Sequence, residues 1–155
     1  MEASMTTLNT RPVDQRLANH AFLKGIDAEQ LAIVSEYATE MEFDTNQYLT
    51  HEGEEADQFY LILEGKVVLR SFMPEHHYTT IQTIGADDIV GLSWLVPPHE
   101  WHFSAQAVRP TTVLAIDGRH LRQKCQEDCA LGYELLWRLA QVIGDRLRTT
   151  RMRLR

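Results

Sequence analysis

The feature that most constrains this chain is a change in hydrophobic period near Gly118. Between residues 41 and 117, apolar and polar side chains alternate in short runs that are separated by turn-forming residues. After Gly118, apolar residues recur every three or four positions, which is the period of an amphipathic helix. Short alternating runs with regular turns are typical of a closed or sandwiched antiparallel β unit. We therefore predict a mainly β fold with flanking helices, in which a double-stranded β-roll, or jelly roll, occupies about residues 41–117.

Several strand-length runs stand out within this region. Each is rich in β-branched or aromatic residues and ends at a turn signal. Gly65 falls between the first two runs, where a tight hairpin turn demands the positive φ that glycine adopts without strain. The predicted strands cover residues 58–63, 66–72, 78–84, 101–108 and 112–116.

Helices are expected on both sides of the roll. Residues 15–39 carry apolar side chains at helical spacing, and Asp27 stands where an N-cap would begin a second short helix. After the roll, the spacing predicts a short helix at 121–126 and a long helix at 131–154.

The length of the chain limits its organisation. A chain of 155 residues fits one compact domain. Residues 1–14 are mostly polar and are predicted to be a flexible N-terminal segment. The single domain is predicted at 15–155, and it closes with C-terminal helices over about 119–154.

The long helix carries a narrow apolar stripe with steps of three and four residues. Such a stripe either packs on its own roll or, where it runs beyond the roll, needs a partner. We expect a homodimer. The predicted dimer-helix residues are Leu136, Leu139, Ile143 and Leu147.

Charge is distributed unevenly along the chain. From Arg119 onward there are nine basic and four acidic residues, a balance of +5, so the net charge of −7 leaves −12 on residues 1–118. Phosphate contacts require clustered Lys or Arg, which argues against a nucleic-acid-binding face on the acidic residues 1–118, so only the basic tail could contact nucleic acid. We therefore expect no specific DNA binding by this chain.

Nothing in the composition indicates a membrane or secreted protein. No apolar run approaches the roughly 20 residues that a spanning helix needs, and the N-terminus lacks the basic start and apolar core of a secretory signal. The two cysteines, Cys125 and Cys129, are expected to be reduced structural thiols. We predict a cytoplasmic protein.

The order of elements and several short motifs resemble the effector domain of the catabolite-activator and fumarate-nitrate-regulator superfamily, a cyclic-nucleotide-binding domain. The resemblance covers roughly residues 17–148. Its motifs are GEEAD and FYLILEGKV within 53–67, GADDIVG at 85–91 and FSA at 103–105. It implies a sensor domain without the helix-turn-helix domain that follows in full-length members of the superfamily.

In that family, a short segment called the phosphate cassette begins at a Gly, and its Glu and Arg bind the ribose and the cyclic phosphate. Gly91, Ser104 and Ala105 match this pattern, but Leu92 stands where the family has Glu and Phe103 where it has Arg. Of the groups that bind the phosphate in the family, we expect this chain to keep a helix N-terminus at 92–94 and the hydroxyl of Ser104. An Arg–phosphate contact is charge-assisted and bidentate, so without it we expect that cAMP is not bound in the usual way.

Apolar and aromatic side chains replace the missing charges of the cassette. Three alternatives follow. The aromatics fill the emptied site, or they line a reshaped pocket for a less charged or flat ligand, with Ser93 and Ser104 as its polar groups. In the third, a nucleotide is bound weakly through helix amides alone. The small-molecule ligand is thus unknown or absent, and no cofactor is expected. The candidate pocket residues are Gly91, Leu92, Ser93, Trp94, Phe103, Ser104 and Ala105.

No arrangement of residues indicates catalysis, so we predict that the chain is not an enzyme. Ser93 lacks the second Gly of a nucleophile elbow. His99 and His102 lack an evident third ligand, and the adjacent His76 and His77 would point to opposite faces of a strand. We predict no metal site and a non-enzymatic sensing module, with a protein as a possible partner. The alternatives are a truncated effector half of a DNA-binding transcription regulator and a metal-binding, cupin-like enzyme.

Overall fold

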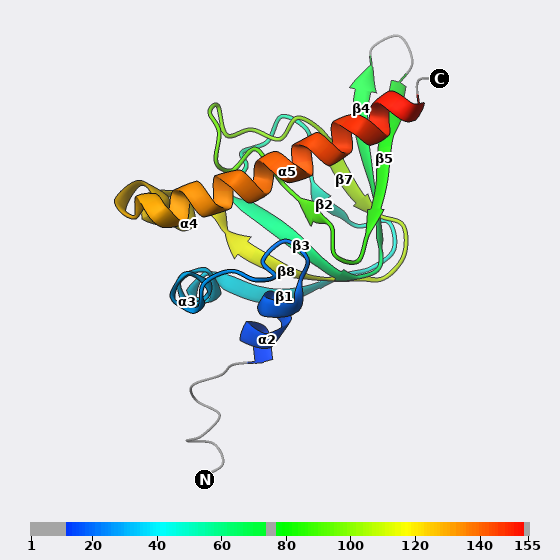
Figure 1. Ribbon diagram of the computed structural model, residues 1–155. Coiled ribbons are helices and arrows are strands. Elements are labelled where there is room, and N and C mark those ends of the chain that lie inside the picture. The colour runs from blue at the N-terminus through cyan, green and yellow to red at the C-terminus, as the bar shows by residue number, and fades with distance from the viewer. Residues whose placement is uncertain (1–11, 74–76, 154–155) are drawn as a thin grey trace.

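The computed structural model describes residues 12–73 and 77–153. Its strands form two four-stranded sheets with antiparallel neighbours, and helices precede and follow them (Figure 1). The first sheet has the order β1-β8-β3-β6 and the second β2-β7-β4-β5. This arrangement confirms the predicted β-roll. The strands are β1 (Ala38–Phe43), β2 (Tyr48–Thr50), β3 (Gln58–Glu64), β4 (Lys66–Met73), β5 (His77–Gly85), β6 (Ile89–Val90), β7 (Ser104–Ala107) and β8 (Thr111–Asp117).

The central strand β3 explains how the roll is layered. Successive side chains of a strand point to opposite faces, and in β3 both faces are apolar. Phe59 and Leu61 pack in a cluster with residues of the helices, whereas Tyr60 and Ile62 pack in a second cluster with residues of both sheets. The described residues therefore form two cores, an outer core under the helices and an inner core inside the roll.

The hairpin between β3 and β4 forms as predicted. Gly65 has a φ of +121°, and a Cβ on this residue would lie 2.6 Å from the Cα of Thr111. The turn thus requires glycine both for its backbone conformation and for the close approach of β8.

The helices are α2 (Pro12–Asn19), α3 (Ala28–Glu36), α4 (Gly118–Glu127) and α5 (Cys129–Arg153). Asp27 caps α3 as predicted and accepts a hydrogen bond from the Glu29 N–H at 3.2 Å. The predicted end of the N-terminal segment is too late, because α2 begins at Pro12, a residue type suited to the first turn of a helix. Residues 1–11, the rest of that segment, lie outside the described residues, as does His76.

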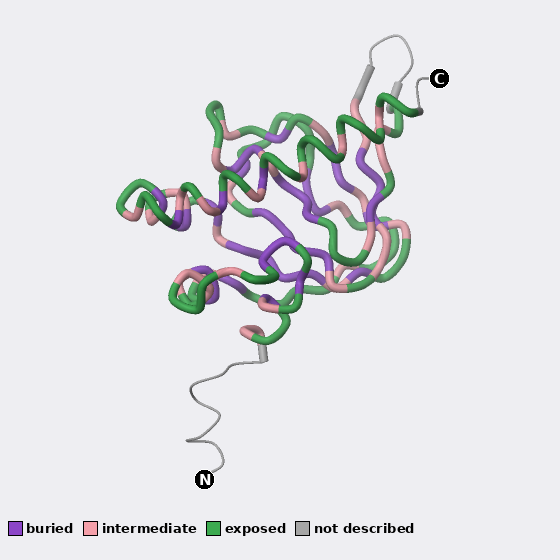
Figure 2. The backbone as a smooth tube through the Cα atoms, viewed as in Figure 1, coloured by how far each residue is buried: buried purple, intermediate pink, exposed green. Residues whose placement is uncertain are grey.

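Helix α5 is the longest helix of the described chain and crosses the roll from α4 toward β4 and β5 (Figure 1). Burial changes along its length (Figure 2). The side chains of Leu131 and Leu135 are fully buried, whereas those of Ile143 and Leu147 are exposed. None of the described helices is both long and apolar enough to cross a membrane.

Three strands were not predicted from the sequence, and one was predicted too long. β1 begins at Ala38, before the predicted start of the roll, while β2 and β6 are only three and two residues long. Residues 101–103 were predicted as strand but lie outside β7, which begins at Ser104.

Candidate functional site

The cassette, residues 91–105, links the short strand β6 to β7. The predicted helix N-terminus at 92–94 is wrong, because residues 93–95 form a turn and no helix follows in the cassette. Two features oppose a helix here. Gly91 has a φ of +116°, and Pro97 and Pro98 lack the N–H groups that a continuing helix needs. The cassette therefore offers no helix dipole to an anion.

The ring of Trp101 lies directly against Gly91. A Cβ on Gly91 would lie 2.7 Å from the Trp101 Cη2 atom and 2.7 Å from the Phe59 Cβ atom. Trp101 itself is only 6% exposed. The backbone of Gly91, at the start of the cassette, is therefore covered by an indole ring.

Main-chain hydrogen bonds hold Trp101 in this position. Its carbonyl accepts from the Gly53 N–H at 2.8 Å, and its own N–H donates to the Glu54 carbonyl at 2.9 Å. Beside these bonds, Glu55 and Glu100 form an isolated antiparallel bridge. The loop that precedes β3 thus fixes this part of the cassette.

Trp94 lies fully buried in the outer core. Its ring stacks on Phe59 with a centroid distance of 4.4 Å and an interplanar angle of 11°. Its Nε1 atom is buried without a hydrogen-bond partner among the described residues. Arg122 of α4 donates to the Trp94 carbonyl, and a Cβ on Gly118 would lie 2.8 Å from the Trp94 Cβ. Trp94 therefore joins the cassette to the start of the C-terminal helices.

The other end of the cassette belongs to the inner core. The Ser104 hydroxyl is buried and accepts from the Glu52 N–H at 3.0 Å, and the Thr50 hydroxyl donates to the Phe103 carbonyl at 3.2 Å. Ala105 is fully buried there, and Phe103 packs against the same cluster. These contacts place the Ser104 hydroxyl on a backbone N–H of the loop that precedes β3.

The structure therefore divides the predicted pocket residues between two places. Leu92 and Trp94 pack in the outer core, whereas Phe103 and Ala105 pack in the inner core. Ser93 is buried at 7% exposure. Four surface cavities of the described chain have linings that include none of the seven predicted residues.

One of these cavities is an apolar groove of about 560 Å³ between the cassette and the C-terminal helices. Its walls include Val96, Tyr133 and Leu136, which are all more than half exposed. Cys125 and Cys129 also line it, both as free thiols, and burial raises the pKa of the Cys125 thiol to about 11. A deprotonated, reactive Cys125 is therefore not expected near neutral pH.

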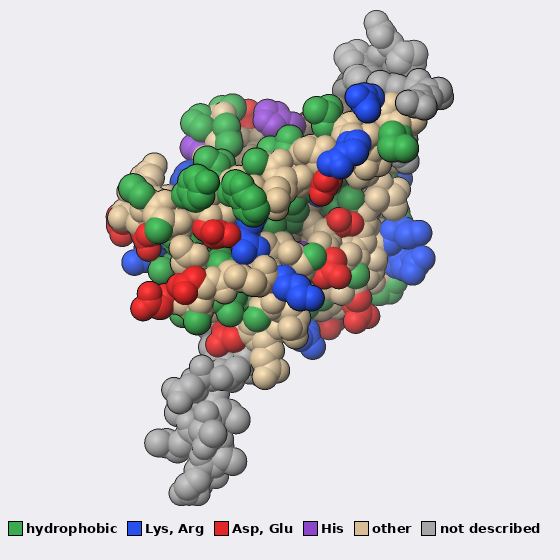
Figure 3. Space-filling model, in the orientation of Figure 1, with side chains coloured by type: hydrophobic (Ala, Val, Ile, Leu, Met, Phe, Trp, Pro, Cys, Tyr) green, Lys and Arg blue, Asp and Glu red, His purple; other side chains and the backbone are tan. Residues whose placement is uncertain are grey.

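The exposed apolar surface of α5 differs from the predicted stripe. Leu139 is 2% exposed and belongs to the outer core, so its assignment to an open stripe is corrected. Hydrophobic side chains gather along α5 near its start, as Figure 3 shows. The other three predicted residues are exposed by about half or more, and they are Leu136, Ile143 and Leu147.

Two exposed aromatic residues of α5 were missed in the sequence analysis. They are Tyr133 and Trp137, which are 70% and 50% exposed. Tyr133 lies three residues before Leu136 and four before Trp137, and these are the spacings at which side chains are neighbours on a helix. The spacing alone could have added both residues to the predicted surface.

Comparison with known proteins gives a consistent result. Residues 40–128 match the cyclic nucleotide-binding domain family. A "CRP-like cAMP-activated global transcriptional regulator" of Mycobacterium tuberculosis is 23% identical over 138 residues, which are 89% of this chain and 60% of that protein. The chain thus spans less than two thirds of the length of that regulator.

Solved structures extend the comparison. A protein of Geobacter metallireducens GS-15, named as a cyclic nucleotide-binding protein, is 30% identical, with a TM-score of 0.79 over 86% of this chain and 97% of that one. The regulatory subunit of a cAMP-independent protein kinase A from Trypanosoma cruzi, solved with guanosine bound, is 25% identical, with a TM-score of 0.64 over 77% of this chain and 45% of that one.

Proposed function

The chain belongs to the cyclic nucleotide-binding domain family, and on this premise we propose that it is a regulatory module whose cassette is filled by its own aromatic side chains. Domains of this family are regulatory and not enzymatic, which leaves no support for a cupin-like enzyme. The proposal is that cAMP is not held here by a phosphate clamp. The observation that carries it is the ring of Trp101 against Gly91.

The electrostatics of the cassette support this proposal. A hydrogen bond from an ionised donor to a buried phosphate contributes about 1.5–3 kcal/mol, and an anion buried without a counter-charge is strongly disfavoured. On the resemblance of residues 91–105 to the family's cassette, Phe103 stands at the position of the family's Arg and Leu92 at that of its Glu. Both side chains are partly buried against apolar clusters, so neither can replace the lost polar contact.

Isothermal titration calorimetry with cAMP tests the proposal. We expect no saturable binding by the wild-type protein at micromolar concentrations and physiological salt. Saturable micromolar binding would contradict the proposal.

A pair of variants tests the role of the indole ring. The double variant Leu92→Glu/Phe103→Arg restores the polar groups but keeps Trp101 on Gly91, and it is expected to gain little affinity. Adding Trp101→Ala removes the ring, and this triple variant is expected to bind more tightly. Circular dichroism checks that both variants remain folded. Equal affinities for the double and triple variants would show that Trp101 does not block the site.

An uncharged nucleoside is a second candidate ligand. The Ser104 oxygen accepts from the Glu52 N–H, and no acceptor of its own proton is found among the described residues, so this hydroxyl is the proposed donor to a ligand. The Trypanosoma cruzi relative was solved bound to guanosine, a nucleoside without a phosphate. Titration with guanosine and adenosine, with Ser104→Ala as the control, tests this candidate. Binding that is absent, or that is unchanged in Ser104→Ala, would rule out this role of the hydroxyl.

We also propose that α5 carries the output of the module by forming a homodimer. The support is the exposed apolar surface at Leu136, Ile143 and Leu147. The length of the Mycobacterium tuberculosis regulator keeps open the alternative that this chain corresponds to the effector half of a transcription regulator. A DNA shift assay on the chain should then show at most salt-sensitive, non-specific retention.

A further inference from the structure

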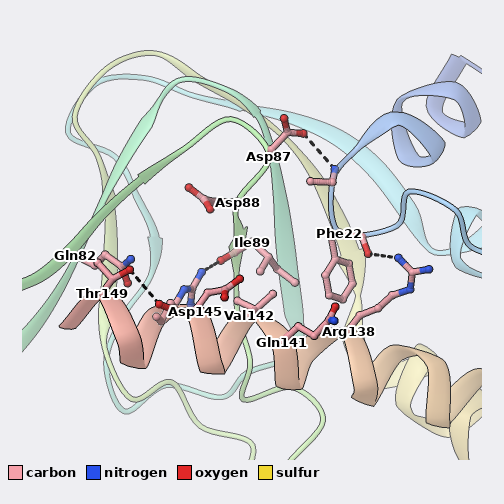
Figure 4. A pocket seen from close by; sticks show the side chains of 12 residues that line it. Phe22, Gln82, Asp87, Asp88, Ile89, Arg138, Gln141, Val142, Asp145 and Thr149 are labelled. Atoms are coloured by element: carbon pink, nitrogen blue, oxygen red, sulfur yellow. Dashed lines mark hydrogen bonds between the residues drawn. The ribbon is translucent and has the colours of Figure 1, made fainter. Parts of the chain in front are cut away.

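Two arginines of α5 reach backbone carbonyls on either side of a cavity beneath the helix (Figure 4). The cavity has a volume of about 330 Å³. Arg138 donates to the carbonyls of Phe22 and Lys24 at 2.8 and 3.1 Å. Arg146 lies about two turns further along α5 and donates to the Ile89 carbonyl of β6. Helix α5 is therefore tied to the rest of the domain at two separate points.

At the first point, Arg138 has several hydrogen-bond partners. The Nε atom of Arg138 donates to Glu134 at 2.7 Å, so the guanidinium has a counter-charge as well as two carbonyl acceptors. Its side chain is 13% exposed. On the same half of the helix, Leu135 and Leu139 are buried in the outer core. Arg138 and its neighbours form a fixed anchor.

At the second point, the hydrogen-bonding groups of Arg146 are only partly paired. One guanidinium nitrogen of Arg146, Nη1, is buried without a hydrogen-bond partner among the described residues. Burial lowers the pKa of this guanidinium, although the nearby Asp88 carboxylate opposes that effect. A buried charge with an unmet donor is costly to keep in place.

The carboxylates around Arg146 are engaged elsewhere. Asp145 accepts from Arg148 at 2.9 Å. Asp88 and Asp87, in the turn before β6, accept from backbone N–H groups at 2.9 and 3.2 Å. In the described part of the chain, none of these three carboxylates forms an ion pair with Arg146. The bond from Arg146 to β6 thus has no ion pair beside it in the described part of the chain, although the charge of the nearby Asp88 carboxylate favours the guanidinium.

Ile89, whose carbonyl accepts from Arg146, lies in the strand directly before the cassette. Ile89 and Val90 make up the whole of β6, and Gly91 of the cassette follows directly. Beyond Val142, no described apolar side chain of α5 belongs to either core. Among the hydrogen bonds of the described residues, the Arg146–Ile89 bond connects the C-terminal half of α5 to the strand that leads into the cassette.

We propose that Arg146 is a releasable latch that couples the position of β6 and the cassette to the C-terminal half of α5. While the latch is closed, residues 143–153 lie along the roll. A shift of Ile89 relative to α5 breaks the bond and frees this half, while the half held by Arg138 stays in place. Arg146 is thus a positioning residue, and its role does not depend on which ligand, if any, the cassette takes.

Hydrogen–deuterium exchange tests the latch. In Arg146→Ala, amide exchange over 143–153 should rise at least about tenfold, while exchange over 129–142 stays near wild type. Arg148→Ala is the matched control, because it removes an exposed arginine of the same helix half, and it should leave both segments unchanged. Arg146→Lys keeps one donor and should restore part of the protection. Light scattering ensures that variants are compared in the same oligomeric state.

A double-mutant cycle separates coupling from simple loss of a contact. Trp101→Ala disturbs the cassette, and in the wild-type background it should speed exchange over 143–153. In the Arg146→Ala background the same substitution should add nothing, because the connection is already broken. Equal exchange in Arg146→Ala and Arg148→Ala would overturn the proposal. So would an effect of Trp101→Ala that is the same in both backgrounds. The calorimetric test of the cassette is independent of either outcome.

Discussion

The two halves of α5 have the same helical period but meet different surroundings. In the first half, leucines such as Leu135 are buried in the outer core, and Arg138 binds two backbone carbonyls and Glu134. In the second half, Ile143 and Leu147 are exposed, and Arg146 is held by one carbonyl. A repeat of apolar residues thus shows that a helix has an apolar face, but the element opposite that face decides whether it becomes core. The first half belongs to the fold, whereas the second is the half to which we assign signalling.

The largest expected effect concerns the free energy of unfolding. Leu135→Ala creates a cavity at a fully buried site and should lower the stability by about 2–5 kcal/mol. In the monomer, Leu147→Ala changes an exposed side chain and should alter this free energy by no more than about 0.5 kcal/mol. Urea denaturation measures both. Similar losses for the two variants would break the distinction between the halves.

The next effect concerns the oligomeric state. Leu136→Asp/Ile143→Asp places two charges on the exposed apolar surface of α5, so the proposed dimer should dissociate and its mass should halve in light scattering. Arg148→Asp is the control, because it adds an acid to the same helix at a residue outside the exposed apolar set. An unchanged mass for the double variant would count against α5 as the dimer interface.

A smaller effect is expected from pH, through the turn to which Arg138 binds. His20 is buried, and its Nδ1 atom accepts from the Phe22 N–H at 3.0 Å, so Nε2 carries the proton and donates to the Ile62 carbonyl at 3.1 Å. Burial lowers the pKa of His20 below its ordinary value of 6.5, against the opposing effect of the nearby carboxylate of Asp87.

The unfolded chain therefore takes up this proton before the folded one. The contribution of His20 to stability is complete above pH 6.5 and is lost as the pH falls from there toward the folded pKa. His20→Gln removes the titration and should flatten this part of the stability profile, measured by urea denaturation at a series of pH values. A profile with the same slope in His20→Gln would show that another group is responsible. Because Arg138 donates to the Phe22 carbonyl, acidification should loosen the first half of α5 more than the second.

The sequence predicted the parts of the fold that depend on local pattern. The strand-length run of β3, the glycine turn at Gly65 and the cap at Asp27 need only neighbouring residues, and all three were found. β1 and β6 were missed because their pairing depends on distant partners. Examples are the pairs Ala38 with Ile116 and Leu61 with Ile89.

The candidate site shows the same limit. The residue types of the cassette, and from them the predicted loss of the family's Glu and Arg, are readable from the sequence. The stacking of Trp94 on Phe59 and the contact of Trp101 with Gly91 are not, because they join residues that pack together only when the roll closes. The burial of side chains on α5 is equally unreadable from the sequence. Leu135 and Leu136 are neighbours in the chain, but Leu135 is fully buried and Leu136 is half exposed.

A crystal structure of the protein grown in the presence of cAMP tests the central claim most directly. The account predicts that the Trp101 ring remains against Gly91, that Trp94 remains stacked on Phe59, and that no nucleotide occupies the cassette. A cyclic phosphate bound between Gly91 and Ser104, with the indole ring displaced and an arginine meeting its charge, would contradict it.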